Sequence, residues 1–180
     1  MNAATNKVLK VAELGNPVLR SPARLVENIQ SPYVQQLIDN LIHTAAKTNG
    51  VGIAAPQVFE SVRLFIVASR PNLRYLHAPV MEPMPMINPQ IVAYSDEQVK
   101  GWEGCLSVPG MRGQVMRSRE IEVVYCDREG QQQQKVFTDF VARIIQHEFD
   151  HINGTVFLDR VESTLDLMSD AEYHARIVCG

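Results

Sequence analysis

Apolar residues recur every three or four positions in two segments of the chain, and this spacing predicts two amphipathic helices with one face toward a core. The first begins after Ser31, whose hydroxyl suits a helix cap, and its register ends at residues 50–52. The second begins at residues 138–139 and stops at the Asn-Gly pair of residues 153–154. A third pattern covers residues 169–178. The inward-facing positions are Val34, Leu37, Ile38, Leu41, Ile42 and Ala45 in the first helix and Val141, Ile144, Ile145, Glu148 and Ile152 in the second.

Several shorter runs of β-branched and aromatic residues predict strands. Pro89 lies inside one of them and favours an edge or a bend there. The glutamines of residues 131–134 are interpreted as a polar hairpin between two others, and residues 69–85 as a long surface loop. Because the strands do not alternate regularly with helices, the pattern indicates an α+β fold rather than βαβ units. The predicted strand segments are residues 62–68, 86–94, 121–125 and 136–137.

The composition is that of an ordinary globular protein, with 180 residues, 46% hydrophobic and 21% charged, and a formal net charge of -3. This length suits one domain, so we expect residues 1–180 to form a single domain. The interleaved charges lack the basic footprint of a nucleic-acid surface, and no apolar run approaches the ~20 residues of a membrane-spanning helix. We therefore expect neither a direct nucleic-acid partner nor a membrane. Residues 1–10 lack the apolar core of a secretory signal, and three widely spaced cysteines indicate free thiols in a reducing compartment.

Candidate chemistry is concentrated in the second predicted helix, where residues 146–151 read Gln-His-Glu-Phe-Asp-His. Residues four apart lie on one face of a helix, so His147 and His151 can bind one divalent metal ion with Glu148 beside it. A carboxylate next to a metal-bound water is the arrangement of a metallohydrolase, in which it takes the proton of the water. The alternative is two histidines paired with acids on a solvated face, and the apolar neighbours of the motif argue against it.

A catalytic metal site of this kind needs a third protein ligand, and the sequence offers two sources. Upstream, Cys105 lies in the segment Glu-Gly-Cys-Leu-Ser between two bends that we interpret at Gly101 and Gly110, and a thiolate is a good soft ligand. Simple packing is the alternative role for this cysteine. The downstream candidates, which another class of zinc peptidase would use, are Asp159, Glu162, Asp166, Asp170, Glu172 and His174.

Residues 50–57 form a third cluster with the sequence Gly-Val-Gly-Ile-Ala-Ala-Pro-Gln. Its small residues let a backbone or a ligand approach closely, but the spacing matches neither the dinucleotide fingerprint nor the phosphate-binding loop. A tight connection between helix and strand is the simpler interpretation. In an acyl-transfer site, however, the amide of Gln57 would stabilise a developing oxyanion.

Taken together, residues 50–57, 103–107 and 146–154 resemble peptide deformylase. The family patterns G-x-G-x-A-A-x-Q, E-G-C-L-S and Q-H-E-x-D-H-x-x-G occur here in the family's order with every fixed position present, and the resemblance covers residues 8–161. It implies short antiparallel β-sheets around a central metal-binding helix. It also implies a hydrolase that removes the N-formyl group from the N-terminal methionine of newly synthesised polypeptides and releases formate.

The resemblance also implies roles for single residues. A metal-bound water attacks the formyl carbon, with Glu148 as general acid and base. The ion, one per chain, is expected to be Fe2+ in the cell, while Zn2+, Ni2+ or Co2+ can occupy the same ligands in purified protein. The implied metal ligands are Cys105, His147 and His151, and the implied oxyanion donors are Gln57 and the backbone N–H of Leu106.

Further expectations concern the residues around the ion. We expect one or both of Gln146 and Asp150 to hold the histidines, with an exposed salt bridge as the alternative for Asp150. We expect Glu103 to brace the cysteine-bearing loop through an ion pair with Arg112. The expected substrate-binding residues are Gly50, Val51, Gly52 and Ile144.

The expected partners are nascent chains that begin with N-formyl-methionine, met near the ribosome exit in the cytoplasm of a bacterium rather than in an organellar matrix. Two other functions compete with this one. A zinc endopeptidase would take an acidic or histidine third ligand after His151, and a silent metal-binding module would only recognise N-termini. Intact Glu148 and Gln57 argue against the silent module, because binding alone needs neither of them.

Overall fold

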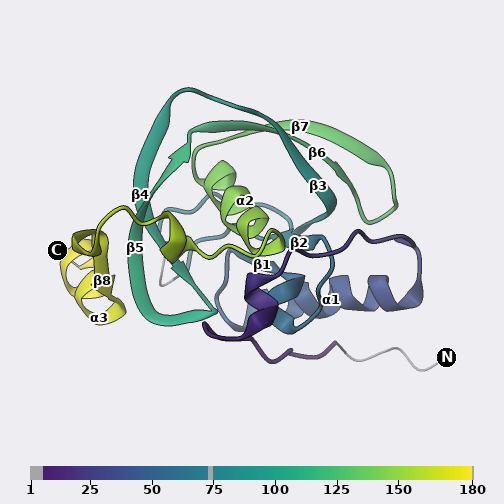
Figure 1. The fold of residues 1–180 in the computed structure, drawn as a ribbon, viewed down its shortest axis with the longest axis horizontal. Coiled ribbons are helices and arrows are strands. Elements are labelled where there is room, and N and C mark those ends of the chain that lie inside the picture. The colour runs from purple at the N-terminus through teal and green to yellow at the C-terminus, as the bar shows by residue number, and fades with distance from the viewer. Residues whose placement is uncertain (1–5, 73–74, 180) are drawn as a thin grey trace.

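Helix α2 (Asp139–Ile152) lies at the centre of the protein, between two antiparallel sheets (Figure 1). The computed structural model describes residues 6–72 and 75–179. The larger sheet has the strand order β1-β2-β3-β6-β7, and the smaller one has the order β4-β5-β8. The predicted α+β fold, with antiparallel sheets around a central helix, is therefore confirmed.

The other elements are short, apart from one helix and two long strands. The larger sheet contains β1 (Gly52–Ala54), β2 (Leu64–Val67), β3 (Met84–Tyr94), β6 (Glu120–Cys126) and β7 (Gln132–Thr138). The smaller sheet contains β4 (Gln98–Cys105), β5 (Val108–Ser118) and β8 (Leu167–Ser169). The other helices are α1 (Pro32–Lys47) and α3 (Asp170–Tyr173), which continues as a π-helical turn over His174–Val178. Short 3₁₀ turns cover Pro17–Arg20, Ala55–Val58, Phe157–Arg160 and Thr164–Asp166. Across residues 6–72 and 75–179, no helix combines the length and apolar character needed to span a bilayer.

Helix α1 forms where the sequence predicts it, because its start is capped and one face is apolar. Ser31 Oγ accepts a hydrogen bond from Val34 N at 3.3 Å, and Pro32 occupies the first turn. All the predicted inward positions except Ile42 are buried, and they pack with β1 and β2 in one core cluster. Burying one such side chain is worth roughly 1.5–3 kcal/mol. The apolar face therefore stabilises this helix more than its cap does.

Helix α2 is buried on nearly all sides, including most of its polar residues from Gln146 to His151. Each of these polar groups consequently needs a partner inside the protein. The helix ends at the predicted Asn-Gly pair. Gly154 has φ +76°, and a Cβ there would lie 2.8 Å from the carbonyl carbon of Arg20, so both conformation and space require glycine.

The hairpin of β4 and β5 carries Cys105 and was not predicted. Gly101, interpreted as a bend, lies inside β4, where a Cβ would come within 2.9 Å of the guanidinium carbon of Arg143. One face of the hairpin packs on α2, while β8 and α3 lie against β5. Because other elements pack on both sides of the hairpin, its strands do not alternate regularly between apolar and polar residues. The alternation by which a half-buried strand is recognised in a sequence is therefore missing.

The polar hairpin predicted at the glutamine run of residues 131–134 is confirmed, because β6 and β7 pair in antiparallel fashion, although most of the run lies in a strand rather than in the connection. The turn comes earlier, where Asp127 Oδ1 accepts hydrogen bonds from the backbone N–H groups of Glu129 and Gln131. Strand β7 then begins at Gln132 and pairs with β6 at the edge of the larger sheet. An edge strand with a solvated face can be built from polar residues that carry little strand signal.

Strand β3 bends at Asn88 and Pro89, so the proline marks a bend rather than an edge. Before the bend β3 pairs with β2 and, at Ile87, also with β6, and after the bend it pairs with β6. Asn88 has φ +51°, and its side chain takes the place of a strand partner for Val26. Asn88 Oδ1 accepts from Val26 N, and Asn88 Nδ2 donates to Val26 O, each at 2.9 Å. This side chain ties the N-terminal segment to the larger sheet.

We predict that Asn88→Ala lowers the free energy of unfolding by about 2–3 kcal/mol, because it removes two hydrogen bonds and puts alanine at a positive φ. Urea unfolding followed by circular dichroism measures this change. Gln90→Ala is the control, since Gln90 is an exposed residue two positions along the same strand. Equal losses in the two variants would contradict the structural role of Asn88.

Candidate active site

Three metal-binding side chains converge at the centre of the protein. Cys105 ends β4, while His147 and His151 lie one turn apart on α2 with ring centroids 5.0 Å apart. The ligand atoms of the three residues all lie within 4.8 Å of one another, and Cys105 Sγ is 3.2 Å from His151 Nε2. All three side chains are buried. Sulfur and imidazole nitrogen in this arrangement form a donor set that fits a divalent transition metal.

Three of the five downstream acids that competed for the third ligand position form ion pairs elsewhere. Asp159 pairs with Arg20, Asp166 pairs with Lys100, and Asp170 pairs with Arg112. Among the residues that the structure describes, the group of three that could hold a metal is formed by the cysteine and the two motif histidines. The geometry therefore favours the upstream thiol over the acidic ligand of another peptidase class.

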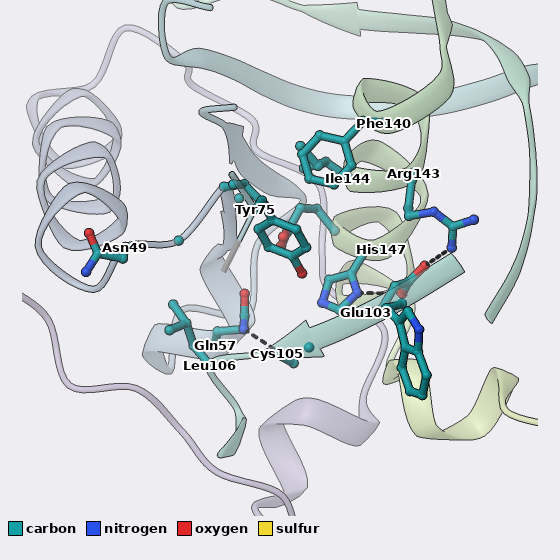
Figure 2. Close-up of a pocket in the computed structure, with 16 residues that line it drawn as sticks. Asn49, Gln57, Tyr75, Glu103, Cys105, Leu106, Phe140, Arg143, Ile144 and His147 are labelled. Atoms are coloured by element: carbon teal, nitrogen blue, oxygen red, sulfur yellow. Dashed lines mark hydrogen bonds and ion pairs between the residues drawn. The ribbon is translucent and has the colours of Figure 1, made fainter. Parts of the chain in front are cut away.

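Glu103 orients one of the two histidines. Its Oε2 lies 2.9 Å from His147 Nδ1, and because a carboxylate can only accept, the proton is on Nδ1 and leaves Nε2 for an ion. Arg117 and Arg143 also donate to this carboxylate (Figure 2 shows Glu103 between His147 and Arg143). Burial alone would raise the pKa of Glu103, but the charge of Arg117 and the hydrogen bonds from His147 and Arg117 hold it well below its usual range.

The two histidines favour the metal-binding form of the Cys105 thiol. Burial would raise its pKa, but the charge of His151 and the hydrogen bonds from both histidines hold the pKa well below the usual range of a thiol. The thiolate is the form that binds metals. His147 shows the reciprocal change: burial would lower its pKa, but hydrogen bonds to Cys105 and Glu103 raise it well above the usual value.

Glu148 lies beside the three ligands and has a spare oxygen. The residue is 4% exposed, and its Oε2 has no hydrogen-bond partner among the described residues. Burial raises the pKa of this carboxyl to about 7, so it can both accept and return a proton near neutral pH. Gly52 leaves the space that Glu148 occupies, since a Cβ there would lie 2.4 Å from Glu148 Oε1.

Gln57 lies in the 3₁₀ turn Ala55–Val58 on the other side of the thiol. Its Oε1 accepts a hydrogen bond from Ala54 N at 2.8 Å, and this anchors the carbonyl end of the amide. Nε2 therefore faces the site, 3.3 Å from Cys105 Sγ and 3.1 Å from Ser107 Oγ (Figure 2). A neutral amide donor held beside a metal ligand is suited to stabilising negative charge on a substrate oxygen.

One pocket opens onto these residues. Gly50, Val51, Gly52 and Ile144 all line it as predicted, together with Leu106. Five further residues line the pocket and were not predicted: Asn49, Tyr75, Trp102, Phe140 and Arg143. Helical spacing could have found two of them, because Phe140 and Arg143 lie four residues before Ile144 and His147. Tyr75 gives no such signal, since it comes from the loop of residues 69–85.

The predicted ion pair between Glu103 and Arg112 was wrong. Gly104, not Glu103, lies opposite Arg112 in the β4–β5 register, so Glu103 and Arg112 point to opposite faces of the hairpin. Glu103 faces α2, whereas Arg112 binds Asp170 and Tyr75 on the other face. The carboxylate of Glu103 still stabilises the cysteine-bearing strand, but through ion pairs with Arg117 and Arg143.

One or both of Gln146 and Asp150 were predicted to hold the histidines, but their side chains form their hydrogen bonds with other residues. Gln146 bonds to both backbone groups of Ser118 and to Ala142 O, which joins α2 to β5. Asp150 accepts from Arg117 and Arg160 and is 5% exposed, so the alternative of an exposed salt bridge was also wrong. On a helix, residues before and after a ligand project to other faces and meet other neighbours.

Comparisons with known proteins agree with this geometry. The polypeptide deformylase family matches residues 8–166. The chain is 62% identical over 167 residues to peptide deformylase 2 of Nostoc sp., with 93% of each chain covered. It is 46% identical to peptide deformylase 2 of Shewanella oneidensis, covering 89% of this chain and 88% of that one. It is also similar to the Met-Ala-Ser-bound class I type b peptide deformylase from Acinetobacter baumannii, with a TM-score of 0.85, 46% identity and coverage of 87% of this chain and 100% of that one.

We predict that Arg117→Met lowers the free energy of unfolding by about 3–5 kcal/mol, because it leaves the buried carboxylates of Glu103 and Asp150 short of a partner. Guanidinium unfolding of the metal-loaded protein measures the loss. Arg119→Met is the matched control, since Arg119 also joins two carboxylates but in solvent, where an ion pair contributes little. Similar losses in both variants would show that burial of the network is not what matters.

Proposed function

This chain belongs to the polypeptide deformylase family, and we propose here which of its residues carry out deformylation. The enzyme hydrolyses the N-formyl group of the N-terminal methionine of newly synthesised polypeptides and releases formate. The observation that supports the assignment best is the convergence of Cys105, His147 and His151 within 4.8 Å, next to the buried carboxyl of Glu148.

We assign Cys105 Sγ, His147 Nε2 and a ring nitrogen of His151 as the ligands of one divalent ion. When bound there, such an ion would act as a Lewis acid and would lower the pKa of a water molecule beside it. One thiolate and two imidazoles suit Fe2+, Co2+, Ni2+ and Zn2+ alike, and the family resemblance favours Fe2+ as the physiological ion. Glu103 supports the assignment because it fixes the tautomer and the ring orientation of His147.

Glu148 is the proposed acid and base. Its free Oε2 accepts a proton from the water as the water oxygen bonds to the formyl carbon. The carbon–nitrogen bond then breaks, Glu148 returns the proton to the leaving amine, and formate departs. The raised pKa of Glu148, about 7, suits both transfers because the carboxyl gains and loses its proton at similar cost.

Gln57 and Leu106 are the proposed donors to the oxygen of the formyl group. The amide of Gln57 is anchored through Oε1, so its Nε2 stays directed at the site as charge develops. Leu106 follows the metal-binding cysteine and lines the pocket, which puts its backbone next to the same region. A preorganised donor of this kind is worth roughly 3 kcal/mol of transition-state stabilisation.

The pocket beside these groups is proposed to hold the methionine side chain. Gly50, Val51, Gly52 and Ile144 line it, and apolar walls suit a flexible thioether. The related enzyme from Acinetobacter baumannii binds Met-Ala-Ser. This peptide is the product that deformylation of formyl-Met-Ala-Ser would give. This supports a substrate of the form formyl-Met-Ala-Ser for the present chain.

We also propose that residues 1–180 act as one domain on nascent chains near the ribosome exit, in the cytoplasm of a bacterium. The family match over residues 8–166 and the bacterial origin of the relatives support this setting.

We predict that Glu148→Gln lowers kcat for formyl-Met-Ala-Ser by roughly 10²–10⁴-fold, because the amide keeps the size of the side chain but cannot accept the proton. Formate release measures the rate, and the metal content of the same sample is the control. Bound metal with near-normal turnover would remove Glu148 from the proton transfer.

We predict that Cys105→Ser weakens metal binding by more than the roughly 10–100-fold that loss of an outer partner costs, because the hydroxyl is a poor ligand for these ions. Competition with a chelator, followed by metal analysis, measures the affinity. Cys126→Ser is the control, since Cys126 is a thiol on β6 outside the group of three ligands. Unchanged affinity in Cys105→Ser would exclude the thiol as a ligand.

A further inference from the structure

Arg112 is the largest side chain in the fully buried core, and the chemistry proposed above does not use it. It projects from the face of the β4–β5 hairpin that points away from α2. Its Nε donates to Asp170 Oδ1 at 2.7 Å, and a terminal nitrogen donates to the hydroxyl of Tyr75 at 3.1 Å. Its guanidinium carbon also lies 4.9 Å from the ring centroid of Tyr173. A buried cation thus joins α3 to Tyr75, in the loop that precedes β3.

Gly104 provides the space in which this guanidinium lies. A Cβ at Gly104 would be 2.6 Å from one terminal nitrogen of Arg112 and 2.7 Å from its central carbon. Gly104 is also the neighbour of Cys105 and lines the pocket. The cation therefore passes directly behind the strand that carries the thiol, and reaches the pocket rim only because that position lacks a side chain.

Tyr75 links the contacts of Asp170 and Arg112 to the substrate pocket. It lines the pocket, with its ring 5.0 Å from the ring of Phe140 on α2 (Figure 2). A loop residue would be free to swing away from the pocket, because loops have few packed neighbours. Backbone bonds with Asn72 hold the main chain of Tyr75, and the hydrogen bond from Arg112 restrains its phenol. Trp102, another wall of the pocket, is held in a similar way by an edge-to-face contact with Tyr173 at 5.6 Å.

We propose that Asp170 and Arg112 are positioning residues, which hold the Tyr75 ring as a wall of the substrate pocket and thereby set the affinity for the peptide. Asp170 orients and neutralises Arg112, and Arg112 holds the phenol. The segment of residues 167–178 therefore tunes peptide binding although it does not line the pocket. This inference rests on the deformylase function proposed above, but it concerns binding of the peptide rather than the reaction.

Two variants separate this role from general stability. Tyr75→Phe removes only the phenol oxygen, and Asp170→Ala removes the countercharge of Arg112. We expect each variant to raise KM for formyl-Met-Ala-Ser by about threefold to tenfold, the effect of losing one ordering hydrogen bond, with kcat nearly unchanged. Because Asp170 acts through Tyr75, the double variant should raise KM no further than the stronger single one.

The matched control is Asp166→Ala, which breaks an ion pair between the residue just before this segment and Lys100 of β4 but does not reach Tyr75. It should leave KM unchanged. Trp102 is the only tryptophan and lines the pocket, so its fluorescence reports the Kd of Met-Ala-Ser on the metal-loaded enzyme without turnover. The Kd should rise in parallel with KM in Tyr75→Phe and Asp170→Ala.

Three results would overturn the proposal: unchanged KM and Kd in both single variants, additive effects in the double variant, or an equal effect of Asp166→Ala. A wild-type enzyme that binds Met-Ala-Ser but does not release formate would instead contradict the proposed function. The binding titration would still test the role of Asp170 and Arg112 in that case.

Discussion

The buried carboxylate of Glu103 is the interaction on which the site depends. It belongs to β4, yet its three partners come from two other elements: His147 and Arg143 from α2, and Arg117 from β5. A carboxylate without such donors could not remain ionised at this depth. Because it is paired on both oxygens, it holds the hairpin against the helix and at the same time fixes one metal-binding ring. Stability of the fold and geometry of the site are therefore set by the same contacts.

The network also explains why so polar a helix can be central. Asp150 accepts hydrogen bonds from Arg160 and from Arg117, which also pairs with Glu103. The side-chain amide of Gln146 forms hydrogen bonds with the backbone N–H and C=O of Ser118. Charged pairs of this kind stabilise less than an apolar core of equal volume, because desolvation offsets much of their attraction. What they provide here is orientation. Rotating α2 about its axis would break these contacts, so they favour the observed rotation.

The sequence predicted helix α1, helix α2 and the three ligands, because helical periodicity and closely spaced motifs leave direct local signals. It did not predict what depends on register between strands. Glu103 and Arg112 are suitable partners by charge, but pairing of Gly104 with Arg112 puts them on opposite faces. The β4–β5 hairpin itself lacked alternation because both of its sides are covered. Tyr75 could not be found either, since a loop residue reaches the pocket through contacts far away in sequence.

The alternation of faces along β4 separates two tasks within three consecutive residues. Glu103 and Cys105 point toward α2 and serve the ion, while Gly104 between them points away and makes room for Arg112. A side chain at Gly104 would push the guanidinium outward without touching the ligands. On the proposal made above, the position of Tyr75 can thus vary with the C-terminal segment, while the groups that surround the ion on the inner side stay the same. The strand that delivers the thiol is for this reason also the strand through which a distant helix can influence peptide binding.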